Sequence, residues 1–143
     1  TSRGSGIDMS NAKVELFDVA LKECQDAGLL IPQPSSETTV VATRCEFANN
    51  RNGAIVFGSL TSATFKNCVF NDNENDGIVV ADKATIHLHG EATATHSNAE
   101  CGISADSSGK VIIHLPSHHN TSYNNGGQDR LTRSGGTITN VED

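Results

Sequence analysis

A glycine that precedes a short run of alternating apolar residues recurs along the chain at intervals of 22 to 25 residues. The members of this series are Gly6, Gly28, Gly53, Gly77, Gly102 and Gly126. After each of the first five, the first and third residues are apolar. Alternate residues of a strand point to opposite faces, so the pattern predicts a strand with one buried face. A period of this length is typical of a solenoid, in which each repeat packs against its neighbours.

Each repeat also contains two later alternating runs, such as Ala63 to Phe65 and Cys68 to Phe70. In the fourth repeat we assign the inward positions of the last run to Ala92 and Ala94. Three short strands per repeat predict an all-β fold, a parallel β-helix of about six coils. A lone amphipathic helix over 11–27 is the less favoured alternative, because that segment has to pair with the next coil.

The regular pattern stops after Gly126 and divides the chain into two parts. Residues 1–127 are predicted to form the coils, and residues 128–143 a polar tail or cap of the same domain. We expect a loop over 129–136 and a last strand over 137–141. A cap is expected because the open end of a β-helix exposes unpaired backbone groups.

Asparagine marks the bend before the repeat glycine. Asn49, Asn73 and Asn98 each stand four residues before such a glycine, and Cys24 holds this position in the first repeat. Asparagine tolerates the left-handed backbone of tight bends, and its amide can bond to the same amide in adjacent coils. The sequence therefore predicts a stacked asparagine ladder with a structural role.

From Gly4 to Asn125 the glycine-led coils, asparagine-rich bends and aliphatic rows resemble the right-handed parallel β-helix superfamily, the pectin-lyase-like group. That group includes polysaccharide lyases, hydrolases and epimerases, phage tailspikes and non-enzymatic modules of some F-box proteins. The resemblance implies a fold and leaves the function open. His89-Gly90 is similar to a dipeptide of the polygalacturonases, but the carboxylates that accompany it there have no counterpart in register, so no catalytic role is carried over.

The net charge of −7 disfavours nucleic acid and membranes as partners. Only 10 lysines and arginines are scattered through the chain, without a basic stripe. No signal peptide or apolar run of ~18 residues is evident. The cysteines, which fit no zinc pattern, are Cys24, Cys45, Cys68 and Cys101. Interpreted as buried free thiols, they favour an intracellular protein, although the compartment stays unknown. We expect Cys45 and Cys68 to point into the core unpaired.

Histidines of two neighbouring repeats form a candidate metal site. His87 and His89 point outward together, because their apolar neighbours face the core. His114 follows His89 by 25 residues, one coil later. Adjacent strands lie roughly 4.8 Å apart, so three imidazoles come within reach of one Zn²⁺, Cu²⁺ or Ni²⁺ ion. Solvated surface histidines are the alternative interpretation.

Two weaker clusters lie near the bends. Asp72, Glu74 and Asp76 begin like a calcium loop, but Lys83 stands where position twelve requires an acid, so at most weak Ca²⁺ binding is expected. The other cluster consists of His96, His118 and His119. Neither spacing is characteristic of a metal site.

An outward aliphatic row forms a candidate interface. The second residue after the repeat glycine faces away from the core, and in the three central coils it is Leu30, Ile55 and Val79. A contiguous apolar row on a flat sheet often marks an interface, and we expect a second copy of the chain to cover it. The preference of branched residues for strands is the other explanation.

No paired acids and no nucleophile with a matching base are evident in the sequence. We therefore favour a non-catalytic β-helix module for binding, assembly or structural support, with a protein partner or a homodimer. The alternative is a carbohydrate-active domain, or a fragment of one, similar to the lyases, hydrolases or epimerases of the group. An enzyme would need a groove in which acids and bases converge.

Overall fold

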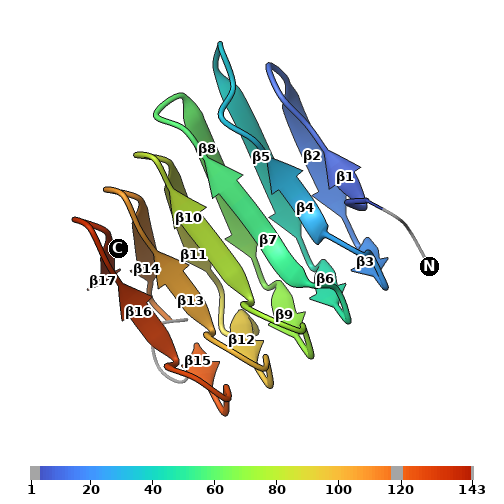
Figure 1. Cartoon of the computed structure of the whole chain (residues 1–143), viewed down its shortest axis with the longest axis vertical. Coiled ribbons are helices and arrows are strands. Elements are labelled where there is room, and N and C mark those ends of the chain that lie inside the picture. The colour runs from blue at the N-terminus through green and yellow to red at the C-terminus, as the bar shows by residue number, and fades with distance from the viewer. Residues whose placement is uncertain (1–3, 117–120, 143) are drawn as a thin grey trace.

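A computed structural model describes residues 4–116 and 121–142. Within these ranges the chain winds into a solenoid in which each strand is followed by a bend (Figure 1). Neighbouring strands of a sheet come from successive coils, so all three sheets are parallel. The expected all-β parallel β-helix is confirmed, with five complete coils and two strands of a sixth.

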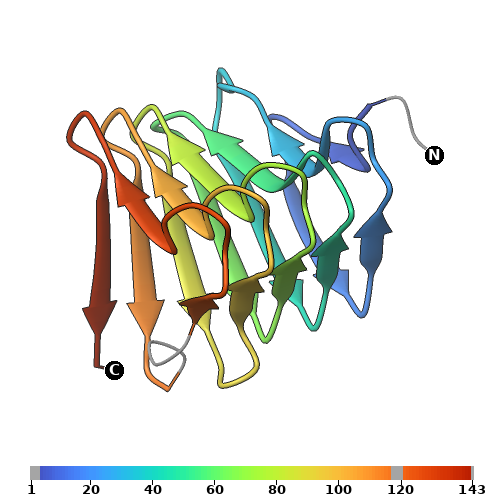
Figure 2. The same ribbon diagram turned by 60° about the horizontal axis from the view of Figure 1, so that its bottom comes forward.

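The coils define three sheets, whose strands meet at the bends shown in Figure 2. The first sheet contains β1 (Ile7–Asp8), β4 (Ala27–Ile31), β7 (Asn52–Phe57), β10 (Ile78–Ala81), β13 (Ile103–Ala105) and β16 (Arg130–Thr132). The second contains β2 (Lys13–Phe17), β5 (Thr38–Thr43), β8 (Thr61–Lys66), β11 (Thr85–His89), β14 (Lys110–His114) and β17 (Thr137–Val141). The third contains β3 (Ala20–Lys22), β6 (Glu46–Ala48), β9 (Val69–Asn71), β12 (Ala94–His96) and β15 (Ser122–Tyr123).

The segment 11–27 forms β2, β3 and the start of β4, so the helical alternative for it is wrong. Each of these strands pairs with the strand one coil later. None of the described residues lies in a helix long and apolar enough to cross a bilayer.

Repeat glycines stack along the edge where the first sheet begins, as predicted. A Cβ on Gly77 would lie 2.7 Å from the carbonyl oxygen of Gly102, so the coils approach to backbone contact here. Gly126 is wrongly included in the series: the register places Asp129 next to Gly102, because Ile103 pairs with Arg130. The bend before β16 is longer than the others, which a fixed count from glycine to glycine does not reveal.

Rows of identical or similar side chains fill the narrow core. The Phe47 and Phe70 rings stack with centroids 4.7 Å apart, and Phe65 meets both edge-on. Such aromatic pairs contribute about 0.5–1.5 kcal/mol each beyond their buried area. All three rings are fully buried, so a few aromatic side chains anchor the central coils.

In the fourth coil the inward row continues through Thr95, which pairs with Phe70, and Thr93 is also buried. The assignment of Ala92 and Ala94 as the inward pair is therefore wrong. The bend between β11 and β12 is longer than the one between β8 and β9, and this shifts the register.

An asparagine ladder runs through the bends between the third and first sheets. Asn73 shows the pattern: its Oδ1 accepts the backbone N–H of Asn50, and its Nδ2 donates to the Phe47 carbonyl and to Oδ1 of Asn98. Asn98 repeats the arrangement with Asn125. Each amide thus satisfies polar groups of its own coil and of both neighbours.

The predicted ladder is confirmed with one correction, since its third-coil member is Asn50 rather than Asn49. Asn50 is buried, whereas Asn49 is exposed and adopts a left-handed backbone with φ of 57°. The residues before the other ladder positions share this conformation, as Ser97 does with φ of 58°. The bend in the third coil is one residue shorter, so counting back from the glycine gives the wrong asparagine.

The tail 128–143 continues the stack in its described part. The predicted last strand 137–141 is confirmed as β17, but the loop expected over 129–136 contains β16. Arg130 succeeds the buried row that ends in Ile103, and its guanidinium donates to Ser122 Oγ at 3.0 Å and to Asn140 Oδ1 at 3.1 Å. Polar side chains therefore take over inward positions in the sixth coil, which supports the interpretation of this tail as a cap.

All four cysteines are free and buried, as expected for Cys45 and Cys68. The Cys68 thiol donates to the carbonyl oxygens of Ala42 and Lys66 at 3.3 and 3.4 Å. Burial raises the pKa of this thiol to about 12.

We predict that Asn73→Ala lowers the free energy of unfolding by roughly 2–4 kcal/mol, because buried groups of two coils lose their partners. Asn75→Ala, which changes an exposed residue of the same bend, should alter it by less than about 0.5 kcal/mol. Urea unfolding measured by circular dichroism compares the two variants. Equal stability of both would contradict the structural role of the ladder.

We predict that Cys68 resists alkylation at pH 8 in the native protein and reacts when the chain is unfolded, because the thiolate forms only at high pH. The folded pKa lies above the unfolded value of about 8.5, so this group stabilises the fold below that pH and loses its contribution as the pH rises toward 12. Mass spectrometry after alkylation and unfolding curves at several pH values measure both effects. Rapid native labelling of Cys68, or a Cys45–Cys68 disulfide peptide, would contradict them.

Candidate functional site

Two adjacent strands of the second sheet carry the predicted histidine cluster. His87 pairs with Ile112 across β11 and β14, and Leu88 pairs with Ile113. The next residues, His89 and His114, therefore lie side by side on the outer face. The structure brings together all three histidines that the spacing selected.

The imidazoles are in contact. Nδ1 of His87 lies 3.0 Å from Nε2 of His114, within hydrogen-bond distance. The rings of His89 and His114 stack with centroids 4.0 Å apart and planes 10° from parallel. Each histidine offers a ligand nitrogen within 4.8 Å of the others, and all three side chains are half-buried. Within the described ranges, this is the group of histidine, cysteine or acidic side chains that could hold a metal ion.

Burial lowers the pKa of His87, and the nearby His114 lowers it further. A neutral imidazole is the form that binds a metal ion. On the other side, β8 places Thr64 opposite His87 and Lys66 opposite His89. The cluster is thus bordered by a hydroxyl and an ammonium group rather than by acids.

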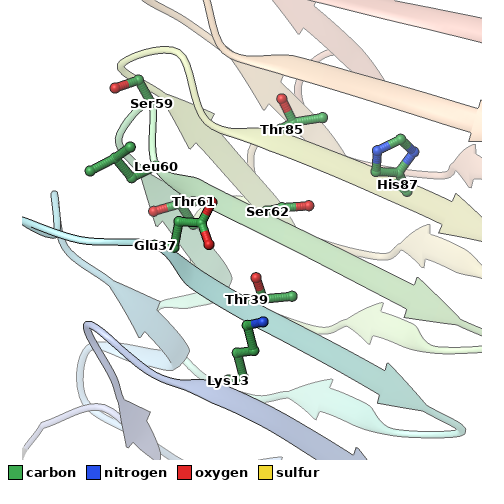
Figure 3. A pocket seen from close by; sticks show the side chains of 9 residues that line it. All are labelled: Lys13, Glu37, Thr39, Ser59, Leu60, Thr61, Ser62, Thr85 and His87. Atoms are coloured by element: carbon green, nitrogen blue, oxygen red, sulfur yellow. The ribbon is translucent and has the colours of Figure 1, made fainter.

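A shallow groove of about 450 Å³ extends from His87 across the second sheet toward its N-terminal coil (Figure 3). Its floor is a column of polar side chains from successive coils, namely Lys13, Thr39, Ser62 and Thr85. Glu37 and Ser59 line one side. Hydroxyls with one cation and one carboxylate suit a small polar ligand. Our sequence interpretation missed this groove, although the column recurs at the coil period.

The predicted interface row lies on the outer face of the first sheet. Leu30 pairs with Ile55, and Ile55 pairs with Val79, so the three side chains form one continuous row. Each is partly exposed. Phe57 and Ala81 pair beside them and widen the apolar surface.

The acidic cluster of the third-to-first bend has a structural explanation for one member. Oδ1 of Asp76 accepts the backbone N–H of Cys101 at 2.8 Å. Burial raises the pKa of Asp76, and Glu100 adds to the effect while Arg133 opposes it. These three side chains line a second groove of about 370 Å³. Asp72 and Glu74 are exposed.

The weaker histidine grouping is only partly described. His96 stacks on Tyr123 with ring centroids 5.0 Å apart, and its Nδ1 lies 2.9 Å from Ser97 Oγ. His118 and His119 lie outside the described residues.

The chain belongs to the family described as the right handed beta helix region, whose model matches residues 5–142. No curated protein and no solved structure gives a significant match. The family match agrees with the parallel coils and establishes the fold, while the use of the sheet faces has to be argued from their chemistry.

Proposed function

We propose that this chain is a non-catalytic β-helix module that assembles through the apolar outer face of its first sheet. The observation that carries the proposal is the in-register row of Leu30, Ile55 and Val79, partly exposed at the centre of that face. Scattered exposed aliphatics are common, but a contiguous row favours a covered surface.

A second copy of the chain is the occupant that fits the ends of this row. A two-fold axis between β7 and β10 places Ile55 of one copy over Val79 of the other. It also places coil one over coil six, so Asp8 approaches Arg133 of the second copy. Opposite charges at both rims and apolar residues at the centre suit an isologous dimer.

The size of the face sets the strength of the dimer. Six strands spaced by about 4.8 Å, each presenting four or five residues, cover roughly 400 Å². A stable interface buries about 800 Å² on each partner. The dimer should therefore be weak and dissociate on dilution.

We predict that Ile55→Asp abolishes this self-association, because it places a carboxylate at the centre of the apolar row. Val41→Asp is the matched control, since Val41 is a branched aliphatic on the outer face of the second sheet. Sedimentation over a wide concentration range should show a monomer–dimer equilibrium for the wild type and Val41→Asp, and monomer for Ile55→Asp. A wild type that stays monomeric at high concentration would refute the dimer.

A carbohydrate-active domain is the second candidate function. It is supported by the hydroxyl-lined groove and by Asp76, a carboxyl with a raised pKa beside Glu100 and Arg133. A carboxyl of raised pKa suits a general acid. Release of reducing ends or unsaturated products from neutral and acidic polysaccharides, lost in Asp76→Asn, would favour this candidate over the module.

A further inference from the structure

We propose that His87, His89 and His114 bind one divalent transition-metal ion, Zn²⁺ in the first place, on the outer face of the second sheet. This site goes beyond the proposed assembly function, which uses the first sheet. It depends on side chains from two coils and therefore exists only in the folded chain.

The nitrogen positions are close to those of a metal site. Each Zn–N bond is about 2.0–2.1 Å, so two nitrogens on one tetrahedral ion lie about 3.3 Å apart. Nδ1 of His87 and Nε2 of His114 are 3.0 Å apart and need to separate by only a few tenths of an ångström. A ligand nitrogen of His89 lies within 4.8 Å of the others.

One ring has to turn before all three can bind the same ion. A metal ion lies near the plane of each imidazole that binds it, whereas His89 and His114 stack with planes 10° from parallel. The terminal torsion of histidine has a broad energy profile, so rotation of the His89 ring is cheap. We expect the stack to open when the ion binds, while the strands keep their register.

The choice of metal follows from the ligands. Imidazole nitrogens suit Zn²⁺, Cu²⁺ and Ni²⁺, whereas Mg²⁺ and Ca²⁺ require oxygen ligands. Three histidines leave a fourth position, which water can fill on this half-exposed surface. Burial keeps His87 neutral at ordinary pH and therefore ready to bind.

Lys66 sets an upper limit on the affinity. It pairs with His89 in register on β8, and its ammonium group repels a divalent cation at this distance. Removal of this charge should therefore strengthen binding, whereas a metal bound elsewhere on the chain would be insensitive to it.

Isothermal titration with Zn²⁺, using the whole chain, tests the site. We expect one ion per chain for the wild type and a loss of at least about 100-fold in affinity for His89→Ala, since even changes behind a ligand cost 10–100-fold. His96→Ala is the matched control, because His96 is a half-buried strand histidine on the third sheet. Its affinity should equal that of the wild type. Thermal unfolding without metal establishes that each variant folds.

Two further measurements make the assignment specific. Lys66→Gln should tighten Zn²⁺ binding severalfold, and Mg²⁺ should give no heat. Zn²⁺ should shift the imidazole ¹⁵N resonances of all three cluster histidines and leave those of His96 unchanged. The proposal is overturned if the wild type gives no heat, if His89→Ala binds as well as the wild type, or if His96→Ala removes the site.

Discussion

The hydrogen bonds of the asparagine ladder hold each coil to the next at the one bend where side chains are not free to vary. An amide such as that of Asn73 bonds to its own coil and to both neighbours. The repeat glycines follow the ladder directly, so polar satisfaction and close backbone approach occur at the same place. At the C-terminal end Asp129 accepts from both nitrogens of Asn125, and a carboxylate replaces the next amide. The other bends carry no such obligation and differ in length.

This register turns sequence distance into spatial distance. Residues one coil apart become neighbours on a sheet face, so each outward position generates a column. The first sheet presents an aliphatic column through Ile55, whereas the second presents hydroxyls, lysines and the histidine cluster. An acidic chain of net charge −7 thus has one face rich in bases and another nearly free of charge. Each face can serve a different partner because the core separates them.

The sequence predicts the fold and the contact of His89 with His114 because both depend on the average period. It fails where a single bend departs from that period. Gly126, Asn49 and the Ala92 assignment all come from fixed counts across bends of unequal length. The 3.0 Å contact between His87 and His114 is diagonal between strands and depends on ring orientation, which alternation of residues does not determine. The grooves depend on bend residues such as Glu37, whose positions follow no period.

The regular spacing of the second sheet also makes its outer face a template for protein engineering. Thr64 and Lys66 hold the positions on β8 that His87 and His89 hold on β11. Histidines introduced at these two positions would lie beside the existing pair at the same strand spacing. Repetition of this change in further coils would extend a line of imidazoles along the solenoid axis, with intervals set by the backbone. The protein can therefore serve as a molecular ruler whose markings are chosen by substitution.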